Sequence, residues 1–167
     1  VEKSESDWTK NPVNVTLRTE LSGYHIQYAI NDASSSSWKT YTQPIQVEDN
    51  NTIIYARLVN ENGEMGNHIT ETIKNIDRLQ PKSVNVEVLE KATSSITIRA
   101  SAEDADETNL DGKSDIAGYQ FYIEGQGWIG EQTSGEYTFI GLKSDTQYLI
   151  KVKAIDNAGN EKESEIQ

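Results

Sequence analysis

The chain of 167 residues contains no cysteine, which limits the settings in which it can work. Small extracellular domains of animals usually depend on disulfides, so a cysteine-free chain indicates either a cytosolic protein or a surface protein of a bacterium. The sequence also lacks an apolar run of about 18 residues, the length that a membrane-spanning helix requires. Val1 is not an initiator and no secretion signal follows it, so we expect a monomeric fragment of a larger chain, without membrane insertion.

Basic residues are scarce: 15 lysines and arginines face 27 acidic residues, and the net charge at neutral pH is −12. A protein that binds nucleic acid needs basic side chains to offset the phosphates, so this composition argues against a nucleic-acid partner. The same deficit disfavours anionic membrane surfaces. An acidic surface instead keeps a protein soluble and attracts cations.

Residues that commonly perform catalysis are also few. There are two histidines, His25 and His68, and the sequence contains no Gly-x-Ser-x-Gly elbow, His-Glu-x-x-His helix or phosphate-binding loop. Glycoside hydrolases need only a pair of carboxylates, which an acidic chain can supply. An enzyme is therefore a third interpretation, weaker than the two given below. Because solvated surface charge explains the acidity more simply, we predict that the chain is not an enzyme.

What the chain does contain is a repeat. The segment Gly23–Tyr28 (Gly-Tyr-His-Ile-Gln-Tyr) reappears 95 residues later as Gly118–Ile123 (Gly-Tyr-Gln-Phe-Tyr-Ile). The turn sequence Asn60–Gly63 has its counterpart 96 residues later at Asp156–Gly159, and each turn closes an alternating apolar run. A strand and a turn repeated at one offset predict two copies of one β-domain, joined head to tail.

Apolar and polar residues alternate along most of the chain, which is the pattern of half-buried β-strands. The clearest run extends from Ile53 to Val59 and ends at the turn signal Asn60–Gly63. We therefore predict an all-β chain of two tandem antiparallel β-sandwiches with seven strands each, over residues 1–77 and 81–167. The linker at 78–80 is short, and Pro81 after it stiffens the connection.

The residues in phase with these alternations are expected to fill the two cores. They are Val15, Leu17, Tyr24, Ile26, Ile54, Ala56 and Leu58 in the first domain, and Val86, Ile96, Ile98, Tyr119, Phe121, Leu142, Tyr148, Ile150 and Val152 in the second.

The second half resembles the fibronectin type III family through two motifs. Leu142–Tyr148 (Leu-Lys-Ser-Asp-Thr-Gln-Tyr) is followed by alternating apolar residues and then by Asp156–Asn160 (Asp-Asn-Ala-Gly-Asn). The resemblance implies that Leu142 plugs the end of the core and that the Tyr148 hydroxyl bonds back to the preceding loop as a tyrosine corner. Residues 98–102 lack the tryptophan that many members carry at this place. The Asp156–Asn160 turn is similar to turns in modules of Gram-positive surface proteins.

The first half resembles the bacterial immunoglobulin-like domains that accompany such modules. The motifs are Asp7-Trp8-Thr9, Gly23–Tyr28, Trp38-Lys39-Thr40-Tyr41 and Tyr55–Val59. A tyrosine corner is not expected here, because Thr52 stands where Tyr148 stands in the second copy.

The densest cluster of carboxylates lies at residues 103–115, which we place in a loop between two strands of the second domain. Calcium prefers six to eight hard oxygen ligands, so the cluster makes Asp104, Asp106, Asp111 and Asp115 candidate calcium ligands. The cluster is no EF-hand, because Asn109 occupies the sixth position from Asp104, where the turn glycine would stand. The simpler alternative is a solvated loop that binds no cofactor.

Three tryptophans, Trp8, Trp38 and Trp128, suggest two different roles. Exposed aromatic side chains can form a platform on which sugars stack. However, Trp38 and Trp128 each follow the same strand of the repeat, which favours a structural role in covering each core.

Together these features favour a non-catalytic spacer or adhesion module of a bacterial cell-surface or secreted protein, located outside the cell. A protein or polysaccharide would be its partner. The alternative is an accessory carbohydrate-binding module of a secreted carbohydrate-active enzyme, and the exposure of Trp38 and Trp128 should discriminate between the two.

Overall fold

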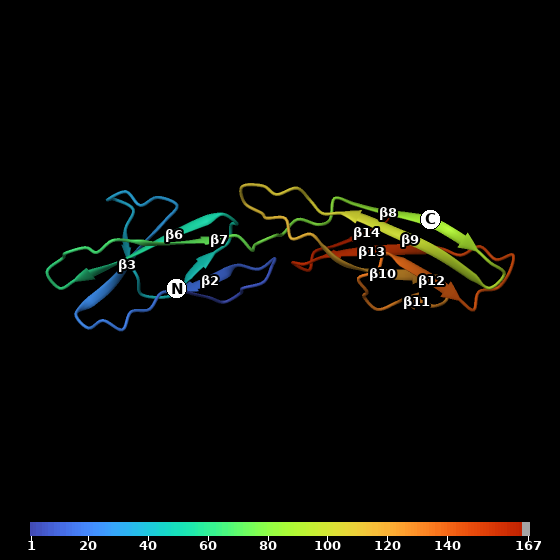
Figure 1. Ribbon diagram of the computed structural model, residues 1–167, viewed down its shortest axis with the longest axis horizontal. Helices are drawn as coiled ribbons and strands as arrows, with labels where there is room; N and C mark the ends of the chain where they lie inside the picture. The colour runs from blue at the N-terminus through green and yellow to red at the C-terminus, as the bar shows by residue number, and fades with distance from the viewer. Residues whose placement is uncertain (165–167) are drawn as a thin grey trace. The chain divides into compact units, whose positions relative to one another are not determined.

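The computed structural model describes residues 1–164, and over this range the chain forms β-strands and no α-helix. Its residues group into two compact units (Figure 1). Unit 1 contains residues 1–78 and 107–112; unit 2 contains residues 79–106 and the chain from Lys113 onward. The predicted class, all-β with tandem antiparallel sandwiches, is confirmed.

Unit 1 is built from two antiparallel sheets with the strand orders β1-β2-β5 and β4-β3-β6-β7. Its strands are β1 (Glu2–Lys3), β2 (Val13–Thr16), β3 (Tyr24–Ile30), β4 (Lys39–Thr40), β5 (Ile45–Val47), β6 (Thr52–Asn60) and β7 (Ile69–Ile73). After β1 the chain changes sides, because Thr9 pairs in parallel with Ile76 beyond the end of β7. The first segment of the chain therefore pairs with β2 through β1 and, further along, with the residue Ile76 that follows β7.

The core of unit 1 lies between the inner faces of these sheets. Strand β2 buries Val13 and Val15 and exposes Asn14, while β6 buries Ile54 and Ala56 at the same spacing of two. Each buried aliphatic side chain of this kind stabilises the fold by about 1.5–3 kcal/mol relative to an exposed one. Tyr41 packs against this core, and its hydroxyl accepts a hydrogen bond from the Leu17 N–H at 3.2 Å.

Unit 2 repeats the plan, with the sheet orders β12-β9-β8 and β11-β10-β13-β14. Its strands are β8 (Ser83–Lys91), β9 (Ser95–Glu103), β10 (Ile116–Ile123), β11 (Gly127–Trp128), β12 (Glu136–Ile140), β13 (Ile150–Asp156) and β14 (Glu161–Glu163). The core is more aromatic than that of unit 1. Phe121 and Phe139 are fully buried, and the Tyr137 ring stacks on Phe121 at 5.2 Å and meets Phe139 edge-on at 4.9 Å.

The predicted tyrosine corner is confirmed. The half-buried Tyr148 precedes β13, and its hydroxyl accepts a hydrogen bond from the Lys143 N–H at 2.8 Å. Leu142 closes the end of the core next to this loop, as the resemblance implied. In unit 1, Thr52 is buried at the corresponding place and its hydroxyl donates to the Asp49 carbonyl at 2.7 Å.

Most of the predicted core residues are buried or pack against the cores. Tyr24 is the clear error, because it is 46% exposed. It is the first residue of β3 and pairs with Asn60, the last residue of β6, so it lies at the rim of the sheet. Leu58 is half-buried and lines a surface cleft rather than the centre of the core.

Candidate functional site

The loop between β9 and β10 holds the four aspartates predicted as calcium ligands, and the structure brings three of them to one pocket. Asp104, Asp106 and Asp115 line a pocket of about 330 Å³ in unit 2, with Glu103 and Lys113. Asp104 is buried, whereas Asp106 and Asp115 are exposed. The pocket therefore combines one buried carboxylate with two exposed ones.

Local hydrogen bonds position these side chains. One carboxylate oxygen of Asp104 accepts the Ala105 N–H at 2.9 Å and the other accepts the Asp115 N–H at 2.7 Å. Asp115 adopts the left-handed conformation, with φ of 63°, which aspartate tolerates better than most residues. Asp106 pairs with the exposed Lys82 at 3.3 Å. The exposed pair contributes little to stability.

The fourth candidate, Asp111, belongs to unit 1. Its carboxylate accepts a hydrogen bond from the Arg78 Nε–H at 2.7 Å and a weaker one from the Arg78 backbone N–H at 3.3 Å. The Asp111 carboxylate thereby raises the pKa of the Arg78 guanidinium above its ordinary value. Asp111 thus already has a cationic partner.

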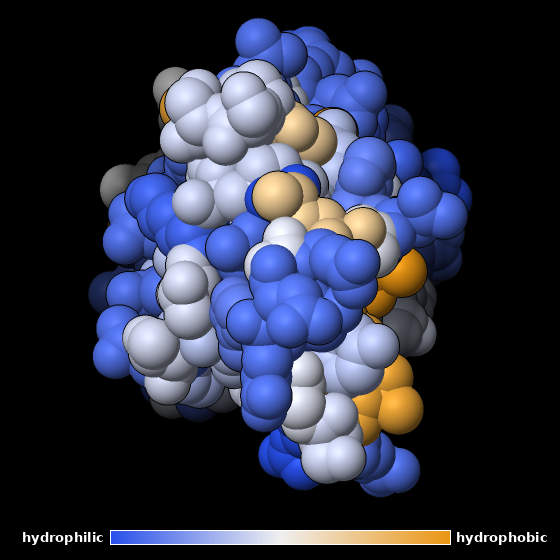
Figure 2. Space-filling view, turned by 90° about the vertical axis from the view of Figure 1, so that its left-hand side faces the viewer, coloured by the Kyte–Doolittle hydropathy of each residue, from blue (hydrophilic) through white to orange (hydrophobic). Residues whose placement is uncertain are grey.

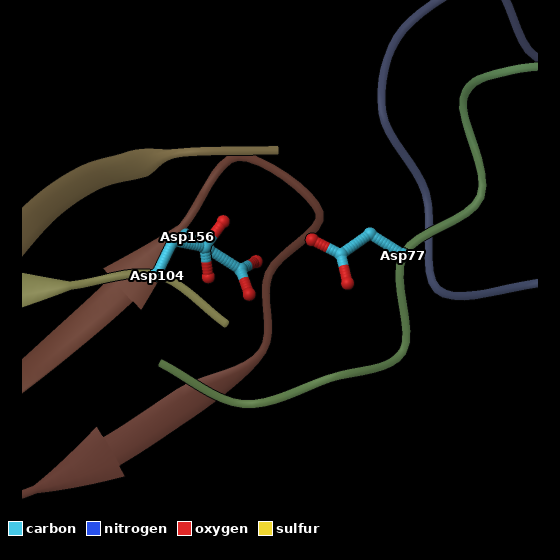
Figure 3. A group of neighbouring side chains, drawn as sticks. All are labelled: Asp77, Asp104 and Asp156. Atoms are coloured by element: carbon cyan, nitrogen blue, oxygen red, sulfur yellow. The ribbon is translucent and has the colours of Figure 1, made fainter. Parts of the chain in front are cut away.

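Asp156 was not predicted as a site residue, although the structure places it beside Asp104. Both carboxylates are buried, and an oxygen of one lies within 4.8 Å of an oxygen of the other. Figure 3 shows Asp104 just beyond β9 and Asp156 at the end of β13, with their carboxylates side by side. Figure 3 also draws Asp77 of unit 1, whose backbone N–H donates to the Thr9 carbonyl at 2.9 Å.

Asp156 is held by its own turn. Its Oδ1 accepts the N–H groups of Ala158 at 2.9 Å and Asn160 at 2.8 Å, and its Oδ2 accepts the Asn160 side-chain amide at 2.9 Å. These three donors fix the orientation of the Asp156 carboxylate within its turn.

The motif Asp156–Asn160 was visible in the sequence, but only as a turn. The alternation of Ile150, Val152 and Ala154 with lysines puts Asp156 in phase with the apolar face at the end of the strand, which is the signal that could have indicated its burial. The proximity of Asp156 to Asp104 depends on the distance between β9 and β13, which lie in different sheets of the sandwich.

Trp38 covers the outer face of a sheet in unit 1. It is half-buried, its Nε1–H donates to the Ala33 carbonyl at 3.1 Å, and the Arg57 guanidinium lies 4.0 Å from its ring centre. Arg57 is held there by two hydrogen bonds from its Nε and Nη2 to the Gln27 side-chain oxygen. His68 and Tyr55 extend the group, with ring centres 5.3 Å apart. One face of Trp38 is therefore occupied by a cation–π contact.

Trp128 is more accessible. It lies on the short edge strand β11, is 41% exposed, and has the Tyr122 ring 5.4 Å away at a tilt of 53°. The Lys153 ammonium lies 5.2 Å from its ring centre. Trp128 is the tryptophan that presents an aromatic surface to solvent.

The two histidines lie on exposed positions. His25 is on β3, and His68 takes part in the ring contacts with Trp38 and Tyr55. No helix long and apolar enough to cross a membrane occurs among residues 1–164.

Unit 1 also has a small apolar cleft of about 230 Å³ between the ends of its sheets, lined by Leu17, Ile26, Leu58 and Ile69, among others. Figure 2 shows the surface of unit 1 seen from the left-hand side of Figure 1. This face is mostly hydrophilic, with small separate hydrophobic patches. It does not present a broad apolar docking surface.

No protein-family model and no curated protein matches the sequence. Among solved structures, a crystal structure of domains A168–A170 from titin matches 96% of this chain and 58% of that chain, with 15% identity and a TM-score of 0.51. The FN1–FN3 domains of chicken CNTN1 match 99% of this chain and 64% of that chain, with 15% identity and a TM-score of 0.44. Fibronectin(III)-like modules of Clostridium thermocellum CbhA match 99% of this chain and 90% of that chain, with 14% identity and a TM-score of 0.43.

The titin domains share the fold of this chain, and at 15% identity the similarity shows the fold alone. The chain spans less than two thirds of the titin and CNTN1 chains.

Proposed function

We propose that the chain is a non-catalytic spacer or adhesion module of a bacterial cell-surface or secreted protein, working outside the cell. The observation that carries this proposal is the repetition of one complete sandwich, each copy with its own core and a polar surface. Such units add length to a protein without a cleft for chemistry. The lack of cysteine and the resemblance to bacterial immunoglobulin-like and fibronectin type III modules support the bacterial setting.

A spacer must bear load, so single-molecule force spectroscopy tests the proposal directly. The full chain, held between identical marker domains, should add two discrete unfolding events to those of the markers. Smooth extension without discrete events would contradict the spacer function. Turnover of a polysaccharide or peptide substrate by the purified chain would contradict its non-catalytic character.

A second candidate function is binding of a polysaccharide, and the exposure of Trp128 beside Tyr122 favours it. Sugar rings present a flat C–H face that packs on an exposed indole, and polar groups next to the ring can bond the hydroxyls. Lys151 and Lys153 pair with Glu163 and Glu161 on neighbouring strands of the same sheet, at 3.6 and 2.9 Å. These pairs would form the polar border of the platform.

The glycan candidate is tested by affinity electrophoresis of the full chain in soluble cellulose, xylan and peptidoglycan fragments. Trp128→Ala should abolish any retardation, whereas Tyr24→Ala removes an aromatic side chain that is 46% exposed in unit 1 and should not. Equal retardation of all three proteins would exclude Trp128 as the platform.

Calcium binding at Asp104, Asp106, Asp111 and Asp115 remains a prediction. The pocket that holds Asp104, Asp106 and Asp115 favours a site made by residues of unit 2, with Asp111 engaged by Arg78 instead. Carboxylate oxygens are the ligands that calcium prefers. Such an ion would serve the spacer function by stabilising the folded module.

A further inference from the structure

Residues 107–112 lie in the loop that connects β9 to β10, two strands of unit 2. They nevertheless pack as part of unit 1. We name this segment the strap. It forms a tight turn in which the Thr108 N–H donates to the Asp111 carbonyl at 2.8 Å. The Thr108 hydroxyl accepts the N–H groups of Leu110 at 3.1 Å and Asp111 at 3.0 Å. The strap therefore has a defined conformation.

Two backbone hydrogen bonds join the strap to the rest of unit 1. The Asn50 N–H donates to the Leu110 carbonyl at 2.7 Å, and the Gly112 N–H donates to the Ile76 carbonyl at 2.7 Å. Asn50 is buried, and its side-chain oxygen accepts the Ile76 N–H at 3.2 Å. Loss of the strap would remove the Leu110 carbonyl and leave the backbone N–H of the buried Asn50 without an acceptor. A buried N–H without an acceptor destabilises the folded state.

Arg78 adds a third attachment. Its Nε–H donates to the Asp111 carboxylate at 2.7 Å, and its Nη2 donates to the Leu110 carbonyl at 3.2 Å and to the Asp49 carboxylate at 3.3 Å. One guanidinium thus joins the strap to the turn before β6. A planar group with several donors is suited to such a junction.

Gly112 lies under the Trp8 ring. A Cβ atom at this position would be 2.5 Å from Trp8 Cζ3 and 2.7 Å from Cη2, which is closer than atoms can approach. The buried position 112 therefore needs glycine because a Cβ atom would clash with Trp8, and not because its backbone adopts a left-handed φ. The half-buried indole closes over the strap.

From this geometry we propose that the strap is a folding link: unit 1 requires residues 107–112 to complete its structure, so its stability depends on a loop of the second sandwich. A disturbance of this loop then destabilises unit 1, although the sequence position of the loop is inside unit 2. The dependence does not rest on the proposed spacer function, and it provides one route by which the state of one module changes the stability of the other.

The test compares the full chain with Gly112→Ala, and with Gly66→Ala as control. At Gly66 the nearest atom to an added Cβ is the Leu58 carbonyl oxygen at 3.7 Å, an ordinary contact in the same unit. Amide hydrogen exchange, followed by mass spectrometry, reports each unit separately. Gly112→Ala should speed exchange in β5 and β6 about tenfold or more, as expected for one lost hydrogen bond and its packing, and leave β10 and β13 unchanged.

Faster exchange in β9 and β10 instead, or in neither unit, would overturn the proposal. If Gly112→Ala does not fold, Asp111→Asn provides a milder variant with the same expected direction, because it removes the charge that holds Arg78.

A double-mutant cycle with Trp8→Phe tests the contact itself. The smaller ring lacks the atoms that the added Cβ would meet, so Gly112→Ala should be less harmful in that background. Equal effects in both backgrounds would show that Trp8 does not hold the strap.

Discussion

The turn after β6 and the turn after β13 have the same backbone structure but different surroundings. In unit 1, the Gly63 N–H donates to the Asn60 carbonyl at 3.0 Å; in unit 2, the Gly159 N–H donates to the Asp156 carbonyl at 3.1 Å. The two glycines have φ angles of 82° and 80°, a conformation that other residues rarely adopt. The repeat seen in the sequence is therefore a repeat of turn geometry.

The side chains of the two turns exchange roles. Asn60 accepts the N–H groups of Asn62 and Glu64 through its Oδ1, as Asp156 accepts those of Ala158 and Asn160. In unit 1 the Asn60 amide donates to the Glu64 carboxylate; in unit 2 the Asn160 amide donates to the Asp156 carboxylate. The amide and the carboxylate have changed places.

The burial of these groups also differs. Asn60 is half-buried and Glu64 is exposed, whereas Asp156 and Asn160 are both buried and Asp156 lies beside Asp104. The same local turn is therefore a solvated connection in one module and a buried polar centre in the next.

The largest effect is expected from Asp156→Ala. The substitution leaves three donors of a buried turn without their acceptor, so the free energy of unfolding of unit 2 should fall by about 3–5 kcal/mol. Asn60→Ala in the more exposed turn should cost unit 1 only about 1 kcal/mol. Urea unfolding of the two variants measures both values. Equal losses would mean that burial does not distinguish the two turns.

Chelation of calcium should have the next largest effect, if the predicted ion binds. At a free concentration of 100 times the dissociation constant, a ligand stabilises the fold by about 2.7 kcal/mol. Differential scanning calorimetry with and without EGTA should then shift the transition of unit 2 and not that of unit 1.

Asp104→Asn should abolish the calcium shift. The matched control is Asp145→Asn, which changes an aspartate of unit 2 in the left-handed conformation that asparagine also tolerates. Identical transitions with and without EGTA would instead support the solvated loop without a cofactor.

The tyrosine corner should give a smaller effect. Tyr148→Phe removes the acceptor of the Lys143 N–H, and because both groups are partly exposed we expect a loss of about 1–2 kcal/mol from unit 2. Tyr41→Phe in unit 1 should cost less, since its bond to the Leu17 N–H is longer, at 3.2 Å. Equilibrium unfolding of both variants ranks the two, and the reverse order would refute the assignment of Tyr148 as the stronger anchor.

The smallest effect is expected at Asp32, in an exposed loop of unit 1. Hydrogen bonds from the Ser37 and Ser34 hydroxyls and the Ser34 N–H lower the pKa of the Asp32 carboxyl below its ordinary value of 3.8. A lowered pKa means that the contribution to stability is present above about pH 4 and is lost as the pH falls through the lowered pKa.

An NMR titration of the Asp32 carboxyl tests this assignment. Ser37→Ala should move its pKa back toward 3.8, whereas Ser35→Ala should leave it unchanged. An unchanged pKa in Ser37→Ala would show that this hydroxyl does not hold the carboxylate.

Much of the fold could be predicted because its causes are local. Alternation with a period of two predicts strands, as in β2 and β6, and the tyrosine corner was implied by the family resemblance that Leu142–Tyr148 carries. Tyr24 shows the limit of this method, because alternation gives the face of a strand and not the extent of the sheet that covers it. The candidate site was predicted less well for a different reason: Asp104, Asp106 and Asp115 are close in sequence, whereas Asp156 is distant and meets Asp104 only through the packing of two sheets.

By itself, the sequence determined the all-β class, the repeat of two sandwiches, the turn chemistry at Gly63 and Gly159, and the acidic surface. These depend on interactions between near neighbours along the chain and on composition. Only the tertiary structure decided that Asp156 lies beside Asp104, that residues 107–112 pack in unit 1, and that Gly112 lies against Trp8. Both arrangements result from packing between segments far apart in sequence, and a local pattern contains no information about which distant surface a loop will meet.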